Sequence, residues 1–131
     1  MKKYICLFVS FFALISVVPL QAAQRITFAP GTSSKAVTGT VNGYTTANYM
    51  VSARAGQTLD LKLDSKNRFL YFNVLDASEN ELPGGPPGGT ATEWSGTLPK
   101  DGDYKVIVFL MRAEARRKGS AFYTLTVTIP K

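Results

Sequence analysis

Short segments in which every second residue is apolar recur along this sequence and point to β-structure. In Thr58–Leu63 every second residue is leucine, and in Phe122–Ile129 three threonines alternate with larger apolar residues. Side chains of a strand point alternately to its two faces, so this pattern is typical of a strand with one buried face. No stretch after Ala23 shows a comparable helical period. The sequence therefore predicts an all-β fold.

Turn residues such as Asn42-Gly43 divide the chain into about eight of these segments. The predicted strands are Arg25–Ala29, Ala36–Val41, Asn48–Ala53, Thr58–Leu63, Leu70–Leu75, Glu93–Leu98, Tyr104–Leu110 and Phe122–Ile129. Seven or eight short strands at this spacing favour an antiparallel β-sandwich, with a barrel as the alternative. Tyr104–Leu110 is almost continuously apolar and is expected at the centre of a sheet. Trp94 is expected to anchor the core.

The first 22 residues have the pattern of a secretory signal peptide. Met1-Lys2-Lys3 is positively charged, Ile5–Val18 is apolar, and Pro19–Ala23 ends in small residues. The apolar run is about 14 residues, short of the roughly 20 that span a bilayer, so we expect cleavage after Ala22 or Ala23 rather than a membrane anchor. The predicted mature protein is then one periplasmic domain, residues 23–131, that is no longer attached to the membrane.

The composition excludes most catalytic chemistry. The chain has no histidine, and its one cysteine, Cys6, lies within the signal peptide. A serine–histidine–acid triad, a cysteine nucleophile and the usual zinc ligand sets are therefore absent from the mature sequence. Asp101-Gly102-Asp103 lacks the further ligands of a calcium loop and is interpreted as a hairpin turn. We expect a protein that binds rather than catalyses, with no cofactor and no metal.

The mature sequence is mildly basic. Without Lys2 and Lys3 it carries 13 basic and 9 acidic residues, a net charge of +4. This charge favours acidic partners. The predicted compartment and the lack of a long basic stripe argue against nucleic acid as a partner.

Two connections are longer than a turn. Asp76–Thr92 is rich in proline and glycine and is interpreted as a surface loop. Met111–Ser120 carries four of the 13 mature basic residues. Arg112 and Arg116 are four residues apart, so a helical turn would place both guanidinium groups on one face. Guanidinium groups suit carboxylates, and the pair could enter an acidic cleft. From spacing alone, an ordinary solvated loop is the preferred interpretation.

A set of short motifs gives a more specific indication. In chain order they are Val41-Asn42-Gly43-Tyr44, Ala55-Gly56-Gln57, Ser95-Gly96-Thr97-Leu98-Pro99, Gly102-Asp103-Tyr104, Leu110-Met111-Arg112, Ala115-Arg116 and Tyr123-Thr124-Leu125. Their order and spacing, over about Ile26 to Ile129, resemble the periplasmic inhibitors of goose-type lysozyme. The resemblance implies a β-sandwich that inserts loop residues into the carboxylate-bearing cleft of a lysozyme.

The resemblance also implies which residues bind the enzyme. In that family a tyrosine after Lys-Gly and two arginines in an Arg-x-x-x-Arg segment contact the lysozyme, and Tyr44, Arg112 and Arg116 match them. Asn42 stands where the family has lysine, which weakens the match of the first loop. Arg117 is expected to add long-range attraction.

The related inhibitors of invertebrate-type lysozyme use a Ser-Gly-x-Tyr loop. Here Asp101, Gly102 and Tyr104 occupy that place, with aspartate instead of serine. These three residues complete the predicted lysozyme-binding set, and the departure from serine makes goose-type lysozyme the expected partner.

Three alternatives stay open from the sequence. The chain could inhibit invertebrate-type lysozyme, or it could be a secreted sandwich module that binds cell-wall glycan or protein, similar to domains appended to bacterial peptidases. It could also be a structural periplasmic subunit. The oligomeric state, a homodimer included, is not determined by the sequence.

Overall fold

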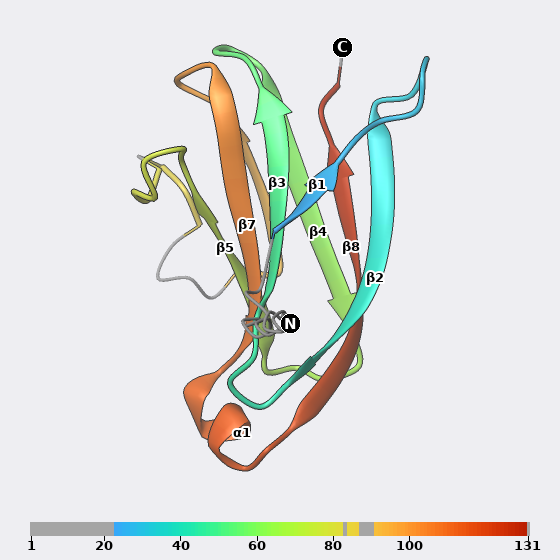
Figure 1. The fold of residues 1–131 in the computed structure, drawn as a ribbon, viewed down its shortest axis with the longest axis vertical. Coiled ribbons are helices and arrows are strands. Elements are labelled where there is room, and N and C mark those ends of the chain that lie inside the picture. The colour runs from blue at the N-terminus through green and yellow to red at the C-terminus, as the bar shows by residue number, and fades with distance from the viewer. Residues whose placement is uncertain (1–22, 83, 87–90, 131) are drawn as a thin grey trace, which may run out of the picture.

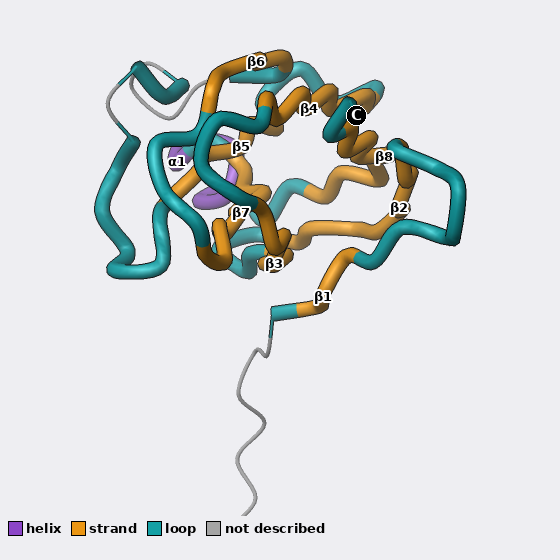
Figure 2. The backbone as a smooth tube through the Cα atoms, turned by 90° about the horizontal axis from the view of Figure 1, so that it is seen from above, coloured by secondary structure: helices purple, strands orange, loops and turns teal. Residues whose placement is uncertain are grey.

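The computed structural model describes residues 23–82, 84–86 and 91–130, which form two facing four-stranded β-sheets (Figures 1 and 2). The strands and the one short helix are β1 Gln24–Ile26, β2 Ser34–Asn42, β3 Ala47–Ala53, β4 Thr58–Ser65, β5 Leu70–Leu75, β6 Glu93–Thr97, β7 Gly102–Leu110, α1 Arg112–Arg116 and β8 Ser120–Thr128. The first sheet has the order β1-β3-β7-β5 and the second β2-β8-β4-β6. The predicted β-sandwich is confirmed. The predicted signal peptide lies outside the described residues.

The period-two pattern of the sequence becomes the core of the sandwich. In β7 every second residue from Tyr104 to Leu110 is buried, and in β8 every second residue from Ala121 to Val127. β7 lies between β3 and β5, at the interior of its sheet, as its apolar sequence predicts. The two inner faces therefore supply a continuous apolar core, which offsets the conformational entropy lost on folding. No disulfide is needed.

One buried hydrogen bond joins the two sheets. The hydroxyl oxygens of Tyr49 on β3 and Tyr123 on β8 are 2.6 Å apart. Gly39 on β2 makes room for this pair, because a Cβ at that position would lie 2.6 Å from the Tyr123 hydroxyl oxygen. Burial, followed by the hydrogen bond with Tyr49, raises the pKa of Tyr123.

Three expectations from the sequence need correction. β1 ends at Ile26 and pairs in parallel with β3, so the fold is not wholly antiparallel. A turn at Ala29–Thr32 ends the predicted first strand early and carries the chain to the other sheet. Trp94 is only partly buried and packs on the edge of the core, because β6 is an edge strand. Its ring covers Gly96, and its indole N–H donates to the Gly84 carbonyl at 3.2 Å.

The described part of the Asp76–Thr92 connection is attached to the sandwich. The Asp76 carboxylate accepts hydrogen bonds from the backbone N–H groups of Ser78 and Asn80, both at 2.9 Å, which closes a tight turn. Leu82 is buried in the core, and Ala91 pairs with Phe72 on β5. The segment is a surface loop, as predicted, and the buried side chain of Leu82 attaches it to the core.

The sandwich has two distinct ends. The α1 end consists of residues 42–46, 64–69 and 111–119, which are the β2–β3 loop, the β4–β5 connection and the segment around α1 (Figure 1, bottom). The hairpin end consists of residues 53–58 and 98–102, the β3–β4 and β6–β7 turns. β7 runs from the hairpin end to the α1 end, and its nine residues separate the two by about 26 Å at 3.3 Å per residue. Among the described residues, no helix has the length and apolar character required to cross a bilayer.

Candidate functional site

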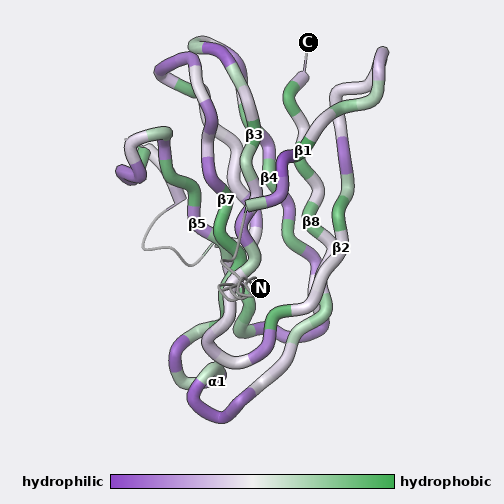
Figure 3. Tube along the Cα trace, in the orientation of Figure 1, coloured by the Kyte–Doolittle hydropathy of each residue, from purple (hydrophilic) through white to green (hydrophobic). Residues whose placement is uncertain are grey.

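Helix α1 is a single turn that is attached to the sandwich by one small side chain. Ala115 is 2% exposed and belongs to the core cluster, whereas Arg112, Arg116 and Arg117 are exposed. The backbone N–H of Met111 donates to the Phe69 carbonyl at 2.8 Å, which fixes where the helix begins. α1 is the helical turn that the sequence allowed as one alternative for this segment, and the i, i+4 spacing places Arg112 and Arg116 on the same side of it. Hydrophilic residues dominate this segment in Figure 3.

The β2–β3 loop lies beside α1 and presents Tyr44. Gly43 has φ +56°, a left-handed conformation that glycine adopts without strain, and its N–H donates to the Gly119 carbonyl at 2.8 Å. The Thr45 hydroxyl closes the turn by donating to the Asn42 carbonyl at 2.7 Å. Tyr44 at the tip is 68% exposed. Its exposure therefore results from a turn that the neighbouring segment holds in place.

Tyr44 and Arg112 line the same groove on the outer side of the first sheet. This groove has a volume of about 350 Å³. Its lining residues are Gly43, Tyr44, Thr45, Thr46, Ile107, Phe109, Leu110 and Arg112. The structure thus brings together residues 68 positions apart in the sequence, and Arg116 follows Arg112 by about one helical turn.

The arginines of this segment differ in their partners. Arg117 donates to a carboxylate oxygen of Glu114 at 2.5 Å. Within the described part of the chain, neither Arg112 nor Arg116 forms an ion pair. A guanidinium group without an internal partner keeps its hydrogen-bonding capacity for a ligand. Arg112 and Arg116 are therefore better placed than Arg117 to bind an external carboxylate.

The charge of the domain is concentrated at the α1 end. Its three segments contain six basic and two acidic residues, a net charge of +4. The rest of the sequence from Ala23 onward contains seven of each and is neutral. The basic residues of the α1 end are Lys66, Arg68, Arg112, Arg116, Arg117 and Lys118. The charge distribution of the molecule is therefore asymmetric, and its electrostatic field orients an acidic partner toward the α1 end.

The other three residues of the predicted set lie at the hairpin end. Tyr104 is 2% exposed, and its hydroxyl donates to the Lys100 carbonyl at 2.6 Å. The Asp101 carboxylate accepts the backbone N–H of Ala55 at 2.7 Å. Gly102 has φ +144°. Asp101 and Tyr104 thus hold the β3–β4 and β6–β7 turns together, and the predicted set is divided between two opposite ends.

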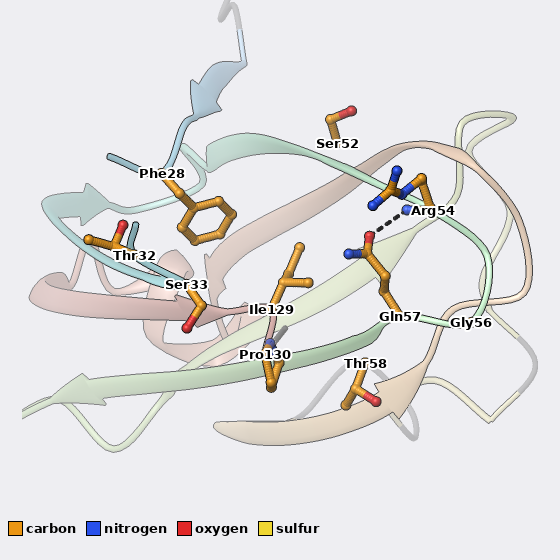
Figure 4. A pocket seen from close by; sticks show the side chains of 10 residues that line it. All are labelled: Phe28, Thr32, Ser33, Ser52, Arg54, Gly56, Gln57, Thr58, Ile129 and Pro130. Carbon is orange, nitrogen blue, oxygen red and sulfur yellow. Dashed lines mark hydrogen bonds between the residues drawn. The ribbon is translucent and has the colours of Figure 1, made fainter. Parts of the chain in front are cut away.

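A second hollow opens at the hairpin end (Figure 4). It has a volume of about 790 Å³, and Phe28 and Ile129 contribute its apolar side chains. Arg54 and Gln57 face it, and the Arg54 backbone N–H donates to the Gln57 side-chain oxygen at 2.7 Å. This hollow is larger than the groove of Tyr44, but it lies at the end without the excess positive charge.

The described residues contain no group of three or more histidine, cysteine, aspartate or glutamate side chains that could hold a metal ion. The class of protein that this fold and site define is a small β-sandwich with a basic surface built from loops at one end.

Comparison of the fold with solved structures identifies the family. The structure is similar to that of PliG from Aeromonas hydrophila, a periplasmic lysozyme inhibitor of g-type lysozyme, with 33% sequence identity and a TM-score of 0.73. The match covers 82% of this chain and 96% of that chain. This chain belongs to the family of periplasmic inhibitors of g-type (goose-type) lysozyme. The resemblance inferred from the motifs is confirmed, as is the expectation that the protein is not an enzyme.

Other solved structures share the fold. PliG of Salmonella Typhimurium matches with 22% identity, a TM-score of 0.65, and coverage of 81% of this chain and 96% of that chain. A pre-peptidase C-terminal domain of a Bacillus anthracis collagenase matches with 16% identity, a TM-score of 0.59, and coverage of 87% and 100%. No family model matches the sequence, and no curated protein matches it.

Proposed function

We propose that this protein inhibits a g-type lysozyme in the periplasm by inserting Tyr44, Arg112 and Arg116 into the active-site cleft of the enzyme. The observation that carries the proposal is that Tyr44 and Arg112 line one groove at the end that holds the whole net charge of the domain. Membership of the inhibitor family supports the choice of enzyme. Glycosidase clefts contain essential carboxylates, which are natural partners for unpaired guanidinium groups.

The mechanism is occlusion by preformed loops. Tyr44 supplies a rigid aromatic surface with few torsion angles to restrict, and the arginines supply planar hydrogen-bond donors. The backbone contact between Gly43 and Gly119 holds the tyrosine loop against the α1 segment before the enzyme arrives. Little conformational entropy is then lost on binding, which favours tight inhibition. Asp101, Gly102 and Tyr104 stay outside the proposed interface, because they lie at the opposite end.

The test is lysis of bacterial cell walls by goose-type, invertebrate-type and chicken-type lysozymes, each with and without the protein. We expect selective loss of the goose-type activity at a near-stoichiometric ratio. Arg112→Ala with Arg116→Ala should weaken inhibition strongly, since truncation of a central interface arginine costs about 2 kcal/mol or more, roughly 30-fold per residue.

Arg54→Ala is the matched control, because Arg54 is an exposed arginine at the hairpin end. It should inhibit like the wild type. Equal inhibition by the double variant and the wild type would contradict the proposed mechanism. Inhibition of the invertebrate-type enzyme alone would contradict the proposed specificity.

A further inference from the structure

A second exposed aromatic side chain lies on the other side of α1 from Tyr44. Phe122 is 64% exposed on the outer face of β8. The residues that follow it on this face are all threonines, Thr124, Thr126 and Thr128. A single exposed phenylalanine is common on protein surfaces, so its surroundings decide whether it has a role.

Phe122 borders a groove between the β4–β5 connection and the start of β8. The groove has a volume of about 720 Å³. Its lining residues are Asp64, Ser65, Lys66, Asn67, Ser120, Ala121, Phe122 and Thr124. Two separate segments thus form a recess with an aromatic side chain at its border, next to a lysine of the basic α1 end.

Hydrogen bonds fix the shape of this groove. The Ser65 hydroxyl donates to the Phe122 carbonyl at 2.7 Å. The Asn67 side-chain amide donates to the Ser120 carbonyl and to a Glu114 carboxylate oxygen, both at 3.2 Å. Asn67 therefore connects the β4–β5 segment to β8 and to α1 at once. The groove and the arginine helix form one preorganised surface.

The groove adjoins the α1 segment, because Asn67, which lines it, is hydrogen-bonded to Glu114 on α1. Two residues, Ser120 and Ala121, separate Phe122 from Gly119 at the end of the α1 segment, a span of about 10 Å of strand. A protein–protein interface of ordinary size buries about 800 Å² per partner, enough to cover both sides of a one-turn helix. Of the two charged residues in the groove lining, Lys66 is positive and Asp64 is negative.

We infer that Phe122 and the β4–β5 connection form a second contact region for the same lysozyme, with Tyr44 on one side of α1 and Phe122 on the other. This inference rests on the proposed function. Its partner surface is the acidic rim of the cleft, with an apolar recess that receives the Phe122 ring. Lys66 faces the acidic groups of that rim. Aromatic side chains are frequent central contacts in such interfaces.

The experiment measures the Kd of the full mature protein for goose-type lysozyme by titration calorimetry. Phe122→Thr matches the neighbouring outward residues and introduces a β-branched side chain, which favours a strand, so the strand is preserved. We expect it to raise the Kd at least about tenfold. Lys66→Ala should raise the Kd by about threefold and reduce its dependence on salt. Lys62→Ala, an exposed lysine further along β4, is the matched control and should leave the Kd unchanged.

The outcomes separate the two proposals. If the wild type does not bind the enzyme, the proposed function fails and this inference fails with it. If the Arg112/Arg116 variant loses binding and Phe122→Thr does not, only the second contact is refuted. If Phe122→Thr no longer binds anionic phosphatidylglycerol vesicles that the wild type binds, and its affinity for lysozyme is unchanged, Phe122 contacts a membrane surface and the inference is overturned. Hydrogen exchange of the wild-type complex gives a check that needs no variant, since residues 65–68 and 120–124 should become protected.

Discussion

The buried tyrosine pair offers a measurable test of how the two sheets are held together. Tyr49 and Tyr123 are 3% and 1% exposed, and their hydroxyl oxygens are 2.6 Å apart. The Tyr123→Phe change removes one hydroxyl and leaves the other buried without its partner. An unsatisfied buried hydroxyl costs about 1–3 kcal/mol. We therefore expect Tyr123→Phe to lower the free energy of unfolding by about 1–2 kcal/mol.

The double variant Tyr49→Phe with Tyr123→Phe makes the test specific. It removes both polar groups, so no unpaired hydroxyl remains, and its cost should be smaller than the sum of the two single costs by about 1 kcal/mol. Urea unfolding followed by circular dichroism gives the values, provided that the slope with denaturant stays constant. Additive costs, or a single-variant cost below about 0.5 kcal/mol, would refute the assigned role of the hydrogen bond.

The same pair predicts the response to alkaline pH. The raised pKa of Tyr123 means that the folded state favours the protonated form. The stability that the protonated Tyr123 contributes is complete below about pH 10, the pKa of a tyrosine in the unfolded chain. It is lost as the pH rises toward the raised pKa of Tyr123 in the folded protein. Tyr123→Phe should therefore lose less stability than the wild type above about pH 10.

Two further predictions concern the edges of the structure. Ala115→Leu should overpack the contact that holds α1, lower the free energy of unfolding by about 1–3 kcal/mol and weaken inhibition. Ala113→Leu, on the exposed side of the helix, is the control and should change the free energy of unfolding by less than about 0.5 kcal/mol. Equal shifts in melting temperature for the two variants would contradict the assigned packing. Arg25 donates to both carboxylate oxygens of Asp103, at 3.0 and 2.9 Å, and these hydrogen bonds lower the pKa of Asp103. Asp103→Asn should therefore be less stable than the wild type at neutral pH, and the two melting temperatures should converge as the pH falls below about 4, because the contribution of a lowered pKa is lost on protonation.

The family and part of the site were accessible from the sequence. The motif order identified the inhibitor family, and the spacing of Arg112 and Arg116 indicated one face of a helical turn, which the structure contains. The sequence predicts Phe122 as part of a strand and does not by itself indicate a role for it. Its outward position, in register with three threonines, was a usable signal. The sequence does not separate the arginines from Asp101, Gly102 and Tyr104. These three residues lie at or next to the start of β7, whereas the arginines follow its end.

The sequence by itself determined the fold class, because the alternation of apolar and polar residues is a local property that each strand displays on its own. It also excluded histidine-dependent catalysis, because the chain contains no histidine. Only the tertiary structure decided which loops meet. Sheet pairing brings Tyr44 beside Arg112 and the β4–β5 connection beside Phe122, over 68 and more than 50 positions of sequence. Such neighbours depend on strand order and register, which are set by long-range packing of the whole core and leave no local trace in the sequence.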